Sequence, residues 1–221
     1  MSLALFDLDR TLIDGYAYAR LMPELWRRGI RRTGLMRLVS RLVIARATSR
    51  APLSSWWPQA FASYLGGLAA TDVAQACAVA AERVRAAVRK ELQQELETRR
   101  AAGDELWLVT ATVHPLAEPV AAALGFEECL STQVAAADGR FERFLAGPVC
   151  RGQEKLARVR QRLLERGLPD DLSSVSYYAD GKEDLPLLAA VGQAIAVCPD
   201  AGLAPIARSR GFRILGAPRA K

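Results

Sequence analysis

The chain has 221 residues, of which 51% are apolar and 24% are charged, and its formal net charge is +6. This size suits one large domain, or a core with a smaller second domain. No apolar stretch approaches the length of a membrane-spanning helix. Asp7 and Asp9 would interrupt the apolar region of a signal peptide. We therefore expect a cytoplasmic protein.

The positive charge is concentrated in the segment from Glu24 to Arg50. Eight arginines and one glutamate give this segment a charge of +7, so the rest of the chain sums to −1. The basic character is therefore local, and we do not expect nucleic acid as a partner. The arginines are Arg27, Arg28, Arg31, Arg32, Arg37, Arg41, Arg46 and Arg50.

The pattern predicts one strand at the N-terminus and then a block of helices. Residues 3–6 form an apolar run typical of a buried parallel strand, and Asp7 and Asp9 follow it. Residues 16–99 contain no convincing strand, and prolines and paired glycines separate the helical segments. The predicted helices are Tyr16–Arg28, Thr33–Thr48, Ser54–Leu65 and Thr71–Arg99.

From Gly103 onward, strands and helices alternate. Asp138-Gly139 is a turn signal, and it predicts a hairpin between Cys129–Gln133 and Phe141–Phe144. The other predicted strands are Glu105–Thr110, Val175–Ala179, Ala194–Val197 and Phe212–Leu215, and the predicted helices are Pro115–Leu124, Gln153–Glu165, Leu185–Ala190 and Leu203–Arg210.

This alternation predicts an α/β fold with a parallel sheet and helices on both faces. The N-terminal strand has to join that sheet, because it could bury nothing alone. We therefore expect residues 1–14 and 103–221 to form the core, and residues 15–102 to form an inserted all-helical cap domain.

The reactive side chains fall at the predicted carboxyl ends of strands, where open α/β sheets bind their ligands. Asp7 and Asp9 follow the first strand, and Thr110 ends the second. Asp180 follows the strand Val175–Ala179, and Asp184 comes four residues later. Two carboxylates at one strand end repel each other and resist burial, and a divalent cation would reconcile them. A carboxylate beside a cation can attack phosphorus.

Four ordered motifs resemble those of the haloacid dehalogenase-like hydrolases. The segment from Asp7 to Thr11 matches the DxDxT motif, Thr110 the second motif and Lys155 the third. Asp180 and Asp184 match the paired acids of the fourth. The predicted helical insertion between the first two motifs is similar to that of the phosphoserine-phosphatase-like branch, subfamily IB. The resemblance implies a Rossmann-like core and Mg²⁺-dependent hydrolysis of phosphate monoesters.

The resemblance also implies a role for each matching residue. Asp7 would be the nucleophile that forms an aspartyl-phosphate, and Asp9 the general acid and then base. Thr110, the backbone N–H of Ala111, and Lys155 would bind the phosphoryl group. Mg²⁺ would be held by Asp7, Asp180 and the backbone carbonyl of Asp9, with Asp184 binding a metal water or orienting Lys155. The dehalogenases of the family lack the second aspartate, so Asp9 favours phosphoryl transfer.

Structural roles are the alternatives for these residues. Asp7 and Asp9 could cap the following helix, Thr110 could be a turn residue, and Asp184 could cap the helix that begins at Leu185. Lys155 could be a solvated helix lysine. His114, the single histidine, could meet substrate or lie in solvent at a helix start.

Two positions depart from the family pattern. Arg10 stands where the family often has glycine. Glu183 stands where the fourth motif usually carries asparagine, and it could either strengthen metal binding or pair with Lys182 in solvent.

The substrate depends on the cap in this family. Residues 110–116 and 150–155 are similar to those of bacterial phosphatidylglycerophosphate phosphatases, which act at the membrane. Leu35, Leu38 and Leu42 share one helix face with arginines beside it, and such a helix can lie on anionic lipid or pack inward. We expect a small-molecule phosphate ester as substrate. The alternatives are a lipid phosphate hydrolysed by a peripheral membrane protein, and a weakly active protein that binds an anionic partner.

Overall fold

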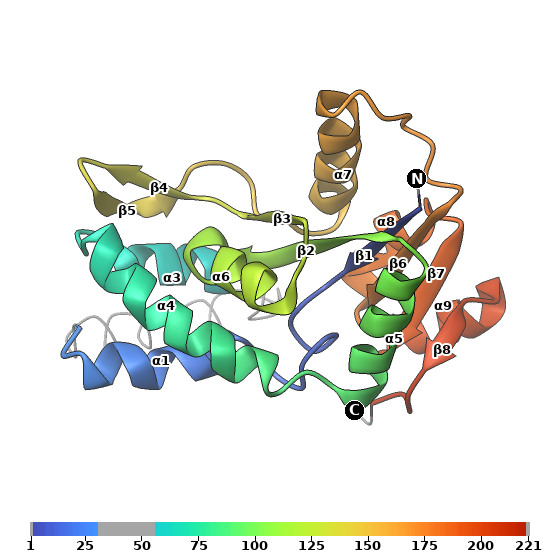
Figure 1. The fold of residues 1–221 in the computed structure, drawn as a ribbon, viewed down its shortest axis with the longest axis horizontal. Coiled ribbons are helices and arrows are strands. Elements are labelled where there is room, and N and C mark those ends of the chain that lie inside the picture. Colours follow the sequence, from blue (N-terminus) through green and yellow to red (C-terminus); the bar gives the residue numbers. More distant parts are fainter. Residues whose placement is uncertain (1, 31–55, 220–221) are drawn as a thin grey trace.

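The computed structural model describes residues 2–30 and 56–219 (Figure 1). The predicted helix Thr33–Thr48, with its leucines and arginines, lies outside the described residues, as does the start of the predicted helix Ser54–Leu65. Among the described residues, no helix combines the length and the apolar character needed to cross a membrane.

A six-stranded sheet forms the core, and each hydrogen-bonded pair of its strands is parallel. The strand order is β3-β2-β1-β6-β7-β8, so the N-terminal strand lies at the centre. This arrangement confirms the predicted α/β fold class. The strands are β1 (Leu3–Phe6), β2 (Glu105–Val113), β3 (Glu128–Thr132), β6 (Val175–Ala179), β7 (Gln193–Val197) and β8 (Arg213–Leu215).

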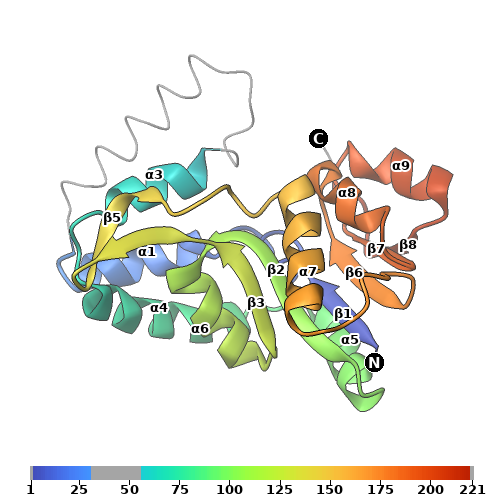
Figure 2. The ribbon, with the colours of Figure 1, turned by 90° about the horizontal axis from the view of Figure 1, so that it is seen from above.

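Alternate residues of each central strand are buried in two different hydrophobic layers. Ala4 and Phe6 of β1 pack in one layer, whereas Leu3 and Leu5 pack in the other. Strands that are buried on both faces carry continuous apolar runs, which is why the sequence shows no polar alternation there. Helices cover both faces, as Figure 2 shows for α7 and α6 on opposite sides of the sheet.

The described helices divide between the two layers and the end of the molecule where α1, α3 and α4 gather (Figure 1). The helices α7, α8 and α9 contribute to one buried layer, and α5 and α6 contribute to the other, which continues into α1, α3 and α4. Their bounds are α1 (Tyr18–Arg27), α3 (Trp57–Leu65), α4 (Ala70–Arg85), α5 (Lys90–Ala101), α6 (His114–Leu124), α7 (Gln153–Glu165), α8 (Leu185–Leu188) and α9 (Leu203–Arg210), and a short 3₁₀ turn, η2, spans Lys182–Asp184.

The prediction of a single helix over Thr71–Arg99 was wrong, because the chain forms two helices, α4 and α5. Between them, Arg89 is extended and its N–H donates to Leu12 O at 2.9 Å, while Val88 pairs with Ile13. This pairing with the loop after β1 takes the segment out of helical geometry.

Helix α5 packs on the sheet. Its Glu95 accepts a hydrogen bond from the Tyr178 hydroxyl of β6 at 2.6 Å, and its Arg99 donates to the same oxygen at 3.0 Å. These contacts favour placing α5 with the core. The division into residues 1–14 with 103–221, and 15–102, stays a prediction.

The turn at Asp138-Gly139 is confirmed, but the first arm of its hairpin differs from the prediction. The predicted arm Cys129–Gln133 largely coincides with β3 of the main sheet, and the hairpin pairs β4 (Val134–Ala137) with β5 (Arg140–Leu145). Main-chain hydrogen bonds join this hairpin to the segment after α3. The N–H of Gly67 donates to Phe141 O at 2.7 Å, and that of Phe141 donates to Leu68 O at 3.0 Å.

Replacing Tyr178 by phenylalanine should weaken the attachment of α5 to the sheet. The ring stacks on Phe6 and would keep its packing, but both hydrogen bonds of the hydroxyl would be lost. We expect the free energy of unfolding in urea to fall by about 1–2 kcal/mol. The control Tyr16→Phe, at an exposed tyrosine, should change the free energy of unfolding by no more than about 0.5 kcal/mol. Equal values for Tyr178→Phe and the parent would contradict this role for the hydroxyl.

Candidate active site

The order of the sheet brings the predicted site residues to one edge. Because β1 lies between β2 and β6, Asp7 and Asp180, which directly follow β1 and β6, lie beside Thr110 of β2. Strand β2 runs on to Val113, three residues past its predicted end, so Thr110 lies inside the strand, before an irregularity in its pairing with β3. From β1 the chain passes to β2 and β3 on one side, and it later crosses to β6, β7 and β8 on the other side; ligands bind at such a switch point. All three residues are buried at the edge of a single cavity.

Residues from the helical side of the molecule also line the cavity. Tyr16 and Tyr18 reach it from the start of α1, and Trp57 and Pro58 from the start of α3. The remaining lining residues include all the predicted site residues, namely Asp7, Asp9, Thr110, Ala111, Lys155, Asp180 and Asp184.

Lys155 joins two of the carboxylates. Its ammonium lies 2.7 Å from Asp7 Oδ1, 2.7 Å from Asp184 Oδ1 and 3.0 Å from the Tyr177 hydroxyl. The hydroxyl of Tyr177 in turn donates to Asp184 at 2.8 Å. All three N–H donors of the lysine are therefore engaged, and its side chain is only 3% exposed. This burial rules out the solvated-lysine alternative.

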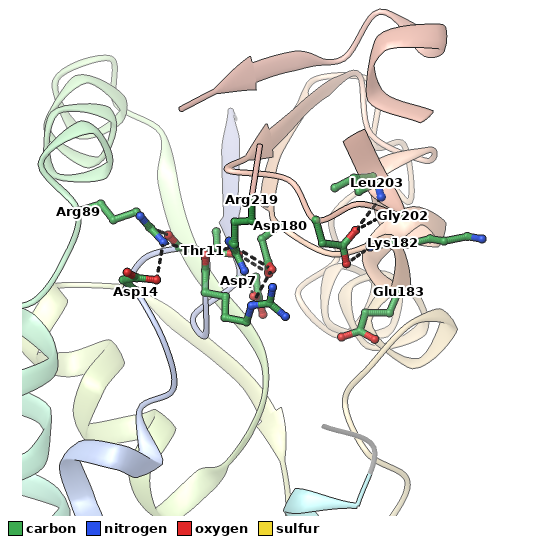
Figure 3. Close-up of polar contacts among 12 residues, drawn as sticks. Asp7, Thr11, Asp14, Arg89, Asp180, Lys182, Glu183, Gly202, Leu203 and Arg219 are labelled. Carbon is green, nitrogen blue, oxygen red and sulfur yellow. Dashed lines mark hydrogen bonds and ion pairs between the residues drawn. The ribbon is translucent and has the colours of Figure 1, made fainter. Parts of the chain in front are cut away.

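Asp180 is held from several sides (Figure 3). The Thr11 hydroxyl lies 3.0 Å from Asp7 Oδ2 and 3.1 Å from Asp180 Oδ1, so it bridges the two carboxylates. The guanidinium of Arg219 lies 2.9 Å from Asp180 Oδ2, and Arg10 Nε lies 3.7 Å from the same oxygen.

Three buried carboxylates are close enough to hold one cation. Single oxygens of Asp7, Asp180 and Asp184 all lie within 4.8 Å of one another. A set of hard oxygen donors with this charge fits Mg²⁺. The carboxylate of Asp9 is not in this group, and its predicted ligation through the backbone carbonyl stays a prediction.

Burial and crowding change the acidity of these carboxylates. Burial raises the pKa of Asp7 to about 8, with Lys155 acting against this and the charges of Asp184 and Asp180 adding to it. Burial also raises the pKa of Asp180 to about 6, although Arg219 opposes the shift. The pKa of Lys155 is raised well above its usual range, because the attraction of Asp184 and Asp7 for its charge outweighs the opposing effect of burial.

Asp9 points toward β2 and the start of α1. It accepts a hydrogen bond from the Thr112 hydroxyl at 2.6 Å and from the Ala17 N–H at 2.7 Å. Burial raises its pKa, while both hydrogen bonds lower it. A carboxyl group with a raised pKa, lining the cavity, is suited to hold a proton and donate it.

The remaining predicted residues take different positions. Thr110 is buried and its Oγ1 accepts from the Thr112 N–H at 3.1 Å. Asp184 makes no capping hydrogen bond to α8 and instead binds Lys155. His114 is not among the residues that line the cavity; it accepts from the Val134 N–H at 3.1 Å, and burial lowers its pKa.

Glu183 pairs with Arg151 rather than with Lys182 or the carboxylate group. Both partners of this ion pair line the cavity. The residue at the position of the usual asparagine therefore neutralises a cation of the cavity wall.

Three contributors were missed by sequence reasoning. Thr112 lies two residues beyond Thr110 in the same strand, and this spacing is the signal that could have found it. The sequence around Tyr177 is typical of a buried strand and gives no sign that its hydroxyl belongs to the site. Arg219 lies near the C-terminus, far from each motif, and nothing in its surroundings in the sequence points to Asp180.

The chain belongs to the haloacid dehalogenase-like hydrolases, whose family model matches residues 4–189. This confirms the resemblance inferred from the four motifs. A protein with unknown function from Bordetella pertussis Tohama I has a similar solved structure, with a TM-score of 0.82, 27% sequence identity and 97% of each chain covered.

Several curated relatives carry phosphatase names, and two of them name different substrates. The phosphoserine phosphatase SerB1 of Mycobacterium tuberculosis is 39% identical over 113 residues, which are 51% of this chain and 36% of that protein. A histidinol-phosphatase of Neisseria meningitidis is 33% identical over 124 residues, which are 54% of this chain and 55% of that protein. The chain thus matches about a third to a half of the length of these relatives.

The raised pKa of Asp7 predicts a pH dependence of stability in chelator. The folded protein holds a proton on Asp7 that the unfolded chain releases near its ordinary value of 3.8. The stabilisation is therefore complete below that value and is lost as the pH rises through about 8. Between these two values the folded protein holds one proton more than the unfolded chain, so the free energy of unfolding should fall as the pH rises from about 4 to about 8 and should level off above that. The fall between about pH 6.5 and pH 8 is assigned to Asp7, because it lies above the pKa of Asp180, which is about 6.

The variant Asp7→Asn should remove this decline, because it cannot lose the proton. Urea titrations of both proteins across the range measure the effect. A decline of the same size in Asp7→Asn would assign it to another group.

Proposed function

We propose that the protein is a Mg²⁺-dependent phosphomonoesterase that acts on a small-molecule phosphate ester through an aspartyl-phosphate. The observation that carries the proposal is the group of Asp7, Asp180 and Asp184 around Lys155 at the edge of a cavity. The phosphatase names of the two relatives support the same reaction class.

The nucleophile in this proposal is Asp7. One of its oxygens attacks phosphorus, and the bond from phosphorus to the ester oxygen breaks. Lys155, Thr110 and the backbone N–H of Ala111 stabilise the charge on the phosphoryl oxygens. Because the three donors of Lys155 are engaged in the free protein, one of them exchanges its carboxylate or hydroxyl partner for a phosphoryl oxygen.

Asp9 moves the protons. It gives its proton to the departing alcohol oxygen, and the resulting carboxylate then takes a proton from the water that attacks phosphorus and releases Asp7. The hydrogen bonds from Thr112 and Ala17 fix the carboxyl group in the cavity for both steps. Bound Mg²⁺, held by Asp7, Asp180 and the Asp9 carbonyl with Asp184 nearby, would keep Asp7 ionised and offset the charge of the phosphate.

The lipid-phosphate alternative and the anionic-partner alternative both depend on the arginine-rich cap segment. Most of that segment lies outside the described residues, so these alternatives gain no support from the described cavity. The two named relatives differ in substrate, and a wider panel of esters, including a lipid phosphate in micelles, identifies the physiological one.

The nucleophile is tested with Asp7→Asn. The parent should release inorganic phosphate from 4-nitrophenyl phosphate in Mg²⁺, stop in chelator and recover when Mg²⁺ is restored. Asp7→Asn should lose on the order of 10³-fold or more in kcat, because the amide cannot attack phosphorus, and it should keep the circular dichroism spectrum of the parent. The control Asp72→Asn, at an exposed position of α4, should be fully active. Activity retained in Asp7→Asn would exclude Asp7, and full activity in chelator would exclude the metal.

The proton role of Asp9 is tested by the leaving group. In Asp9→Asn, 4-nitrophenolate should still depart in a burst, because it leaves without protonation, and steady turnover should then be slow. An alkyl phosphate should show no burst and a loss of about 10²–10⁴-fold. Rapid-quench measurements on both esters separate the two steps. Losses of equal size for the first step with both esters would assign Asp9 another role.

A further inference from the structure

The backbone of Arg10 is in a conformation that its side chain disfavours. Its φ is +66°, in the left-handed region, where a residue with a Cβ is less stable than glycine by about 1–2 kcal/mol. The strain lies in the loop between Asp9 and Thr11, beside the reacting groups. A strained residue at a functional site is a reason to ask what its side chain does there.

The surroundings hold this conformation firmly. The Arg10 N–H donates to Gly15 O at 2.9 Å, and its carbonyl accepts from Arg219 Nη2 at 2.6 Å. Arg89 reaches the same loop from another side, where it donates to Thr11 O at 3.2 Å and pairs with Asp14 (Figure 3). These contacts fix the backbone of residue 10 and the point from which its side chain leaves the loop, and glycine would meet the same backbone demand without strain.

Arg10 is one of the residues that line the cavity, and its side chain is 37% exposed. Its nearest carboxylate oxygen among the described residues, on Asp180, lies 3.7 Å from Nε, which is beyond hydrogen-bond distance. Asp180 already has closer partners in Arg219 and Thr11.

The other charged residues of the cavity wall have close partners. Lys155 is enclosed by Asp7 and Asp184, and Arg151 pairs with Glu183. Asp200 accepts from the N–H groups of Gly202 and Leu203 at the start of α9. Among the cationic side chains in the described part of the cavity wall, Arg10 is thus the one that has no carboxylate within hydrogen-bond distance.

We propose that Arg10 is a specificity-determining residue that binds a second anionic group of the substrate, outside the phosphoryl group that is transferred. The inference rests on the proposed phosphatase function and deepens it. It places the substrate among phosphate esters whose alcohol part carries a carboxylate or a further phosphate, because a planar guanidinium binds both in the same bidentate way.

Three esters of similar length test the inference. These are 3-phosphoglycerate, which carries a carboxylate, propane-1,3-diyl bisphosphate, which carries a second phosphate, and glycerol 3-phosphate, which carries neither. The parent should prefer one or both of the first two over glycerol 3-phosphate by about tenfold or more in kcat/KM, which corresponds to one charge-assisted hydrogen bond. The preferred ester shows which anionic group Arg10 binds.

Two variants of Arg10 separate the effect of its side-chain charge from the effect of its backbone strain. Arg10→Gln keeps the strain and Arg10→Gly relieves it, and both should reduce the preference by about tenfold or more. Arg10→Gly should also raise the melting temperature by about 2–4 °C, since the strain is removed. A lost preference in a variant that is more stable than the parent cannot come from unfolding.

The control is Arg160→Gln, which removes an arginine from the exposed side of α7 and should keep the parental preference. If the Arg10 variants lose activity equally on all three esters, Arg10 binds the transferred phosphoryl group and the inference is overturned. An unchanged preference overturns it as well. Failure of the parent to release phosphate from each of these esters and from 4-nitrophenyl phosphate would instead overturn the proposed function.

Discussion

The mutual repulsion of three buried carboxylates is the constraint on which this site depends. Asp7, Asp180 and Asp184 lie together at the carboxyl edge of the sheet, and uncompensated burial of such charges costs several kcal/mol for each ion. Two positive charges offset this repulsion. Lys155 lies between Asp7 and Asp184, and Arg219 lies against Asp180. The same concentration of negative charge fits a divalent cation and raises the pKa of Asp7, so structure and proposed chemistry have one electrostatic origin.

The core of the site could be predicted because parallel strands of one sheet have their carboxyl ends at the same edge. Once β1, β2 and β6 are placed in one sheet, Asp7, Thr110 and Asp180 have to meet at one edge, whatever the order of the strands further out. Lys155 could be placed only by resemblance, since its position in the first turn of α7 gives no sign that it turns inward. The strands were predictable for a related reason: their apolar runs are too short for helices and are bounded by turn residues.

The features that sequence reasoning missed depend on contacts between distant segments. The break between α4 and α5 arises where Val88 and Arg89 pair with the loop after β1, and helical periodicity continues through it. The turn signal at Asp138-Gly139 made Cys129–Gln133 the predicted first arm of a hairpin, yet most of this segment pairs with β2 of the main sheet. Arg219 reaches Asp180 only because the chain after β8 folds back to Pro199. Each of these choices is made by tertiary structure, which a local pattern does not contain.

The junction between α3 and the β4–β5 hairpin has a consequence for how the cavity could change over evolution. Gly66 lies so close to Arg143 that a Cβ there would collide with it, and main-chain bonds at Gly67 and Leu68 continue the contact. The part of the cavity wall formed by Trp57 and Pro58 is therefore supported by the β4–β5 hairpin, which lies much later in the sequence. Insertions, deletions or altered twist in the β4–β5 hairpin would shift this wall while every reacting side chain stayed in place. New ester preferences could then arise without any change in the catalytic motifs.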